Sequence, residues 1–313
     1  MSKRKALVTG GAGFIGSHLS NLLEKNKYDV IVYDDFSNGS GSKNLSPKIK
    51  IVKDNILNVK KFRAVCKKVD VVFNLAVKPL MMSFDKPDDV VNVNDYGTYL
   101  VAKTCTELQC KMIHVSSSEV YGTALFHPMK ENHQLFPHTI YAASKASSEL
   151  YVRGYHKSDG LEMVIIRPFN SYGEYMREDT YGAALPNFFN RISKGLPPII
   201  QGSGKQTRDF TYVIDTCRGI MLADQSKKAI SNTFNIGQGE EVSIKKIAEI
   251  MIKKYQTLTG KKIKQGLKFE KPRKGDVMRH LADISYAKKT IGYSPIVSIE
   301  EGIERYLKWK LCI

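Results

Sequence analysis

Tyr141 and Lys145 are the two residues whose types and spacing best suit proton transfer. They lie four positions apart at the start of a predicted helix, so their side chains share one helix face. A tyrosine hydroxyl, with a reference pKa of about 10, is mostly protonated at neutral pH, and a nearby cation favours its ionised form. We therefore expect the pKa of Tyr141 to be lowered and Tyr141 to act as a general base. Such a pair is also common on ordinary helix surfaces, so it needs independent support.

A serine-rich segment after a predicted strand supplies that support. Ser117, Ser118 and Glu119 follow the apolar run 111–116, which is predicted to be the fifth strand of a sheet. Ligands in open α/β sheets bind beyond the carboxyl ends of the strands, so a hydroxyl there can hold a substrate hydroxyl beside Tyr141. The alternative is a capping cluster for the following turn.

A glycine-rich run near the start of the chain predicts a cofactor site. The run TGGAGFIG contains Gly10, Gly13 and Gly16 at a spacing of three, with Phe14 and Ile15 between the last two. Glycines permit a tight turn and let the backbone approach a pyrophosphate, whose charge the helix N-terminus favours. A glycine triplet alone is weak evidence, but its position at the first strand-to-helix junction favours dinucleotide binding.

Two carboxylates about twenty residues later indicate which dinucleotide binds. Asp34 and Asp35 end the second predicted strand, where a carboxylate accepts hydrogen bonds from the adenosine ribose. A 2′-phosphate there would meet like charge and no arginine. The sequence therefore favours NAD over NADP, with an exposed turn as the alternative reading.

The order of apolar runs predicts how these residues are positioned. Val- and Ile-rich runs alternate with helical patterns, which is typical of a parallel sheet covered on both faces. The predicted strands cover residues 5–9, 29–35, 49–52, 69–76, 111–116, 161–168, 198–202, 208–213 and 233–237. The predicted helices cover residues 59–68, 90–108, 185–194, 244–255 and 299–309, with others after residues 14 and 141.

We predict an α/β fold with a Rossmann-type doubly wound parallel sheet. Residues 1–170 form the NAD-binding domain, and residues 171–313 form a smaller C-terminal α/β substrate lobe. Elements from about 208–237 are expected to pack back onto the first domain.

Composition limits the classes of partner. The net charge of +17 comes from scattered single lysines and lysine pairs without a nucleic-acid-binding motif, so we interpret it as a solvated surface. Five cysteines form no CxxC pair or metal-ligand spacing, so no metal site and a reducing compartment are expected. No stretch approaches the roughly 18 apolar residues of a membrane span. A cytoplasmic protein is expected, without nucleic-acid or membrane partners.

Five motifs in order carry a family resemblance: TGGAGFIG, SSSEVYG, YAASK, RPFNSYG and QTRDFTYV. Together they resemble the extended short-chain dehydrogenase/reductases, specifically the nucleotide-sugar epimerase/dehydratase group. The resemblance covers nearly the whole chain. It implies that Tyr141 is the base, Lys145 is its partner, and Ser117 is the catalytic hydroxyl.

The resemblance also implies binding residues. In addition to the glycine run, Asp34, Asp35, Tyr141 and Lys145, the cofactor set comprises Asn38, Asn55, Ile56, Leu75, Ala76, Lys78, Asn94 and Pro168, where Asn94 supports the active-site helix. The substrate set comprises Ser117, Asn170, Arg208, Arg273, Asp276 and His280. Arginine suits the nucleotide's phosphates because its guanidinium forms forked, charge-assisted hydrogen bonds.

Members of this group share oxidation at the sugar 4-hydroxyl and differ in the fate of the 4-keto sugar. The resemblance implies that a 4,6-dehydratase needs an adjacent Asp–Glu pair, whereas this chain has Ser118 before Glu119. Ser-Ser-Glu is close to the pattern of uronate decarboxylases. These carry an arginine where this chain has His280, a position at which epimerases select for or against 2-acetamido sugars.

The sequence favours a UDP-hexose C4-epimerase. A UDP-glucuronate decarboxylase or a nucleotide-sugar 4,6-dehydratase is the alternative, with Ser118 and Glu119 deciding the outcome. A non-catalytic NAD-binding regulatory protein is less favoured, because it would not need a base and its partner cation. The resemblance also implies a homodimer formed through the helices near 90–108 and 141–155.

Overall fold

The apolar runs of the first half form a seven-stranded parallel sheet. The computed structural model describes residues 3–37, 41–177, 184–263, 266–271 and 278–313. Within them the sheet order is β11-β6-β5-β4-β1-β2-β3, and every neighbouring pair is parallel. The strands are β1 (Lys5–Thr9), β2 (Asp29–Asp34), β3 (Lys50–Lys53), β4 (Val71–Asn74), β5 (Lys111–Val115), β6 (Met163–Pro168) and β11 (Thr233–Ile236).

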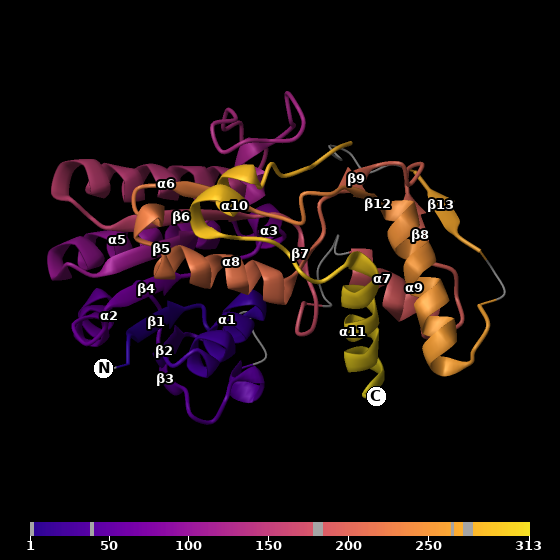
Figure 1. Ribbon diagram of the computed structural model, residues 1–313, viewed down its shortest axis with the longest axis horizontal. Coiled ribbons are helices and arrows are strands. Elements are labelled where there is room, and N and C mark those ends of the chain that lie inside the picture. The colour runs from indigo at the N-terminus through magenta and orange to yellow at the C-terminus, as the bar shows by residue number, and fades with distance from the viewer. Residues whose placement is uncertain (1–2, 38–40, 178–183, 264–265, 272–277) are drawn as a thin grey trace.

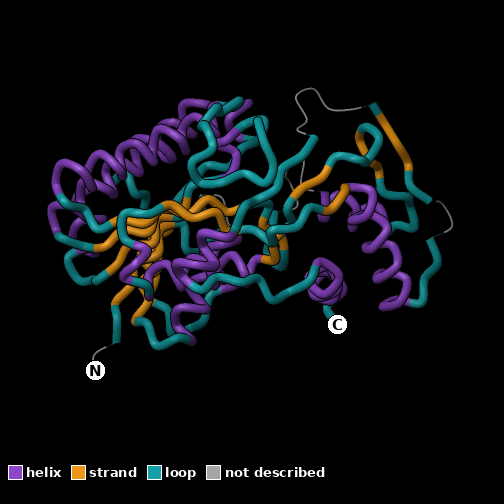
Figure 2. Tube along the Cα trace, turned by 45° about the horizontal axis from the view of Figure 1, so that its top comes forward, coloured by secondary structure: helices purple, strands orange, loops and turns teal. Residues whose placement is uncertain are grey.

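Helices cover both faces of this sheet, because successive side chains of each strand enter opposite cores. Ala6 and Val8 of β1 pack in one core, and Leu7 packs in the other. The first core also contains α1 (Phe14–Lys25) and α8 (Val213–Gln225), and the second contains α2 (Val59–Cys66), α5 (Gly97–Leu108) and α6 (Ile140–Asp159). Figures 1 and 2 show the helices on either side of the strands. The predicted Rossmann-type fold is confirmed.

The predicted helix 90–108 is a continuous helical segment that contains a stretch of π-helix. It begins with α4 (Pro87–Val90), continues as π-helix over Val91–Tyr96, and ends as α5. The π-helix occurs mostly as single turns inside α-helices, frequently at functional sites. Here that turn contains Asn94, whose side chain is buried.

The second half contains short strand pairs and further helices, drawn on the right of Figure 1. β7 (Ser171–Tyr172) pairs with β10 (Thr211–Tyr212), β9 (Thr207–Arg208) with β12 (Val242–Ser243), and β8 (Ile199–Gln201) with β13 (Lys268–Glu270). The helices of this half, besides α8, are α7 (Ala184–Ile192), α9 (Ile244–Thr259), α10 (Ser285–Ile291) and α11 (Ile299–Leu311). Short helical turns are α3 (Met82–Asp85), η1 (Gly41–Asn44), η3 (Ser118–Tyr121) and η4 (Lys227–Ala229).

Several features of the second half differ from the prediction, which did not include the short strands β7, β12 and β13. The run 208–213 is two short strands rather than one, and its last residue, Val213, begins helix α8, which the sequence reading missed together with α10. The β-branched start of α8 resembles a strand, but burial against α1 outweighs that local preference. Through α8 and β11, the second half contributes elements to the main sheet layer.

Among the described residues, no helix is both long and apolar enough to cross a bilayer.

Candidate active site

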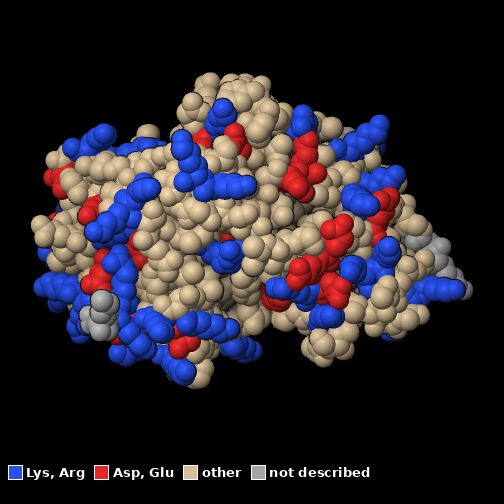
Figure 3. All heavy atoms as spheres, in the orientation of Figure 1, with Lys and Arg blue, Asp and Glu red and all other residues tan. Residues whose placement is uncertain are grey.

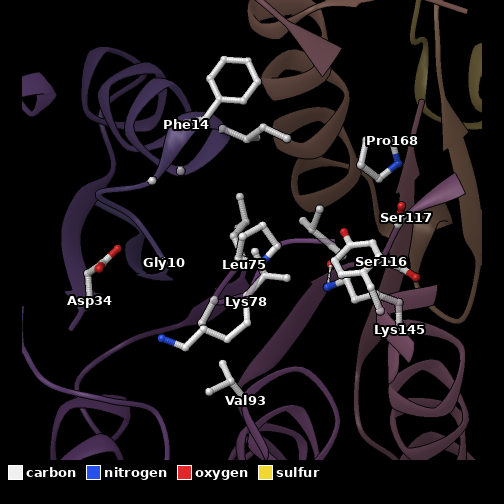
Figure 4. A pocket seen from close by; sticks show the side chains of 18 of the residues that line it. Gly10, Phe14, Asp34, Leu75, Lys78, Val93, Ser116, Ser117, Lys145 and Pro168 are labelled. Carbon is white, nitrogen blue, oxygen red and sulfur yellow. Dashed lines mark hydrogen bonds between the residues drawn. The ribbon is translucent and has the colours of Figure 1, made fainter. Parts of the chain in front are cut away.

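A cavity of about 420 Å³ lies at the carboxyl ends of the parallel strands. Its wall includes the glycine run after β1, Asp34 at the end of β2, and the serines after β5. Figure 4 shows Gly10 and Asp34 at one end and Ser117 and Lys145 at the other. One cavity therefore joins the predicted cofactor and proton-transfer residues.

The glycine run has the shape of a phosphate cradle. Gly10 has a φ of +64°, and a Cβ at Gly16 would lie 2.0 Å from the carbonyl oxygen of Gly10. Side chains are therefore excluded at both positions. Helix α1 begins after Gly13 without a side-chain cap, so its first N–H groups point to the cavity end of the helix. The loop fits a dinucleotide pyrophosphate.

The acidic end of the cavity is tightly organised. Asp34 accepts hydrogen bonds from the N–H of Ala12 (2.9 Å) and of Phe36 (2.8 Å), which fixes the glycine loop against β2. Asp35 accepts a hydrogen bond from the amide of Asn55 (2.7 Å). The ammonium group of Lys78 donates to the Ser37 hydroxyl (2.6 Å) at the same end. Asp35, Asn55 and Lys78 all lie on the cavity wall.

Asn94 lies behind the cavity wall and links two segments by hydrogen bonds. Its amide oxygen accepts from the Lys78 N–H (2.7 Å), and its amide nitrogen donates to the Lys78 carbonyl (3.0 Å) and the Ser144 hydroxyl (3.3 Å). Asn94 thus joins the segment after β4 to α6, which carries Tyr141 and Lys145.

The proton-transfer residues lie together at the other end. Thr139 caps α6 by accepting the N–H of Ala142 (3.1 Å), which places Tyr141 in the first turn. The Lys145 ammonium donates to the Val115 carbonyl (2.6 Å) at the end of β5. Burial lowers the pKa of Lys145 to about 8. The Ser117 side chain lies beside Tyr141 and lowers its pKa.

The predicted lowering of the Tyr141 pKa depends on an oxidised, positively charged cofactor as well as on Lys145, and in the chain by itself the shift has the opposite direction. Burial raises the pKa of Tyr141 to about 12, and the Ser117 side chain offsets only part of this rise. The nearby carboxylate of Glu119 raises the pKa of Tyr141 further. A further positive charge in the cavity is needed to make Tyr141 an effective base.

Ser118 and Glu119 also lie on the cavity wall. Burial raises the pKa of Glu119, and the charges of Arg208 and His138 act in the opposite direction. Glu119 is the acidic residue of this serine segment, because position 118 carries a hydroxyl rather than a carboxyl group.

The predicted substrate residues fall in different places. Asn170 lines the first cavity and also a second one of about 260 Å³, whose wall includes Arg208 and two phenylalanines. His280 lines neither. It is buried, stacks on Phe169 (4.9 Å between ring centres) and lies 3.4 Å from the amide of Asn170 through Nδ1. Burial lowers the pKa of His280 to about 4, so the ring is neutral.

The remaining predicted positions are accounted for as follows. Gly10, Gly13, Phe14, Ile15, Gly16, Ile56, Leu75, Ala76 and Pro168 line the first cavity. Asn38, Arg273 and Asp276 lie outside the described residues.

The structure adds wall residues that the sequence reading missed. The Ser116 hydroxyl is buried on the cavity wall without a hydrogen-bond partner among the described residues, which suits a polar ligand. Met176 and Arg177 also line the cavity. Ser116 lies inside the SSSEVYG motif and could have been found there, whereas the loop containing Met176 and Arg177 has no motif.

Comparisons with known proteins identify the family. Residues 7–306 match the family model described as GDP-mannose 4,6 dehydratase. A putative UDP-glucose 4-epimerase of Methanocaldococcus jannaschii is 35% identical over 97% of each chain. Other relatives are named as nucleotide-sugar decarboxylases and a dehydratase.

Two solved structures share the whole fold. A UDP-N-acetylglucosamine 4-epimerase from Methanobrevibacter ruminantium, in complex with UDP-N-acetylmuramic acid, has a TM-score of 0.91 at 31% identity, covering 100% of this chain and 99% of that one. A UDP-glucuronic acid 4-epimerase from Bacillus cereus, in complex with UDP-glucuronic acid and NAD, has a TM-score of 0.87 at 33% identity, covering 99% and 100%. This chain therefore belongs to the GDP-mannose 4,6-dehydratase-like family of extended short-chain dehydrogenase/reductases, the enzymes that epimerise, dehydrate or decarboxylate nucleotide sugars.

Proposed function

We propose that this protein is an NAD-dependent C4-epimerase of a UDP-hexose. The observation that carries the proposal is Ser118 on the cavity wall, at the position where dehydration would need an acid. A hydroxyl is a much weaker acid than a carboxyl group, so elimination of water from the sugar lacks its proton donor. Without that step, a 4-keto sugar formed in the cavity is left to be reduced again.

The first cavity suits NAD because it has a glycine cradle and an acidic end. The glycine run would hold the pyrophosphate, and Asp34 and Asp35 the adenosine ribose. When bound, NAD would supply hydride acceptance and return at carbon 4, and its oxidised ring would be positively charged. That charge opposes the rise in the pKa of Tyr141 caused by burial.

The chain's own residues then handle the proton. Lys145 stabilises Tyr141 as a phenolate, and Ser117 holds the sugar 4-hydroxyl beside the Tyr141 oxygen. The phenolate then takes the proton of that hydroxyl and becomes a neutral phenol, while the hydride of carbon 4 would pass to the cofactor. Returning the proton from Tyr141 completes either epimer. The second cavity, with Arg208 and its aromatic wall, would take the nucleotide.

Decarboxylation remains the second candidate because of Glu119. Its carboxyl group lies in the cavity with a raised pKa, which suits a second acid or base acting on a 4-keto sugar. Against this candidate, the position expected to carry a carboxylate-binding arginine holds His280, which is neutral and behind the wall.

Incubation with single substrates distinguishes the candidates. UDP-glucose, UDP-N-acetylglucosamine and UDP-glucuronate are each supplied with NAD, and the products are identified by NMR. We expect the 4-epimer of a hexose, with no loss of carbon. A pentose nucleotide or an accumulating 4-keto-6-deoxy sugar would contradict the epimerase proposal. Tyr141→Phe should reduce kcat by roughly 100-fold or more and still bind NAD.

A further inference from the structure

The segment 173–177 forms part of the cavity wall on the side of helix α1. It follows β7, and its last two residues, Met176 and Arg177, line the cavity together with Gly13 and Phe14 of the glycine run. Met176 also packs against the larger core. This segment therefore lies beside the part of the cavity that we assign to the cofactor pyrophosphate.

His18 attaches this segment to the cofactor helix. It lies one turn after Phe14 in α1, and its Nε2 lies 2.9 Å from the carbonyl oxygen of Glu174. Because a carbonyl only accepts, Nε2 carries the hydrogen. The His18 ring also stacks on Tyr175, with 4.9 Å between ring centres and 22° between planes. Burial lowers the pKa of His18, so the ring is neutral at pH 7.

The other side of the segment is held by the second half of the chain. The Tyr212 hydroxyl donates to the Glu174 carboxylate (2.7 and 2.8 Å), and Tyr175 meets the edge of Trp309 in α11 at 5.6 Å. Tyr175 adopts a φ of +65°, a conformation that costs a non-glycine residue energy and persists only when neighbours enforce it. His18 and Trp309, on opposite domains, are two of these neighbours.

We propose that His18 is a positioning residue that keeps the segment 173–177 against the bound NAD and thereby slows its release. The proposal rests on the proposed use of NAD. An epimerase oxidises and then reduces the same sugar, so its NAD must stay bound through both steps. The segment 173–177, held against helix α1 by His18, would help to keep NAD in the cavity. His18 makes two separable contacts, a hydrogen bond and a ring stack, so each can be removed alone.

The test measures NAD dissociation from the holoenzyme. NAD content after gel filtration, and the release rate after dilution into an NAD-free buffer, are compared among wild type, His18→Ala, His18→Gln and His18→Phe. Glutamine retains a donor and phenylalanine retains the stack. We expect roughly tenfold faster release for His18→Ala and smaller increases for the other two. Trp309 is the chain's single tryptophan, so its emission reports whether the wall around Tyr175 changes.

His156→Ala is the matched control. His156 on α6 also contacts a backbone carbonyl, that of Leu161 (2.8 Å), but does not line the cavity. It should release NAD at the wild-type rate. A folded His18→Ala that also releases NAD at that rate, with unchanged Trp309 emission, would overturn the proposal. Wild-type protein that binds no NAD would instead refute the proposed function, and the retention role with it.

Discussion

At the scale of single residues, the structure changes how the Tyr141–Lys145 pair is understood. Burial disfavours the charged form of both groups, since the pKa of Tyr141 rises to about 12 and that of Lys145 falls to about 8. At pH 7 Tyr141 is therefore neutral, whereas Lys145 is still mostly an ammonium. Lys145 is 2% exposed, so its ammonium is kept in apolar surroundings at a cost to stability. Tyr141 therefore becomes an effective base only when a bound positive charge lowers its pKa.

Lys145→Met should separate stability from catalysis. Because the folded-state pKa of about 8 lies below the ordinary value of 10.5, the buried ammonium costs up to about 3 kcal/mol below pH 8, and this cost disappears as the pH rises toward 10.5. We expect the variant without cofactor to gain about 1–3 kcal/mol in unfolding free energy at pH 7, less at pH 9.5, and to lose turnover. Denaturant unfolding at both pH values checks this. An equal gain at both would show that Lys145 is not the titrating group.

At the scale of elements, the glycine run shows how a turn dictates residue type. The Gly10 carbonyl lies so close to Gly16 that the first turn of α1 leaves no room for a methyl group. Thr9 reinforces the arrangement, since its hydroxyl accepts from the N–H groups of Leu75 and Ala76 (3.1 Å each) and donates to Asn74 (2.7 Å). The carboxyl ends of β1 and β4 are thus held together at the cofactor cavity.

Two glycine-to-alanine variants should move stability in opposite directions. Gly16→Ala places a Cβ against backbone atoms and should lower the unfolding free energy by roughly 2–3 kcal/mol and weaken NAD binding. Gly154→Ala, in α6 with nothing within 4 Å of its Cβ, should raise it by about 0.5–1 kcal/mol. Thermal or denaturant unfolding measures both. A destabilised Gly154→Ala would contradict the assignment of open space at that position.

At the scale of the whole molecule, the lysine-rich surface suits contact with solvent, whereas the exposed apolar residues near α5 and α6 suit contact with another protein surface. Figure 3 shows lysine and arginine in small groups separated by neutral surface on the viewed face, in keeping with a solvated surface. Helices α5 and α6 pack together, and large apolar side chains nearby are exposed, including Tyr96 (52%), Leu150 (63%) and Tyr151 (40%). Such a surface suits contact with a second copy of the chain.

Leu150→Glu should therefore split a homodimer. A charge on this face costs desolvation energy in a pair and little in a monomer. Sedimentation or light scattering should give wild-type protein about twice the chain mass of 35.2 kDa and the variant that mass itself. Lys25→Ala, on exposed helix α1 surface, serves as the control. Wild-type protein that is monomeric at micromolar concentration would refute this interface.

The sequence by itself determined the fold class, and it predicted the glycine cradle and the proton-transfer pair, because each is encoded by local spacing. Tertiary structure decided what depends on burial and distant contacts. It placed His280 behind the wall, raised the pKa of Tyr141, and converted the end of a predicted strand into the buried helix α8. It also brought together His18 and Tyr175, which are 157 positions apart in the sequence. Packing between such distant segments leaves no periodic pattern in either one.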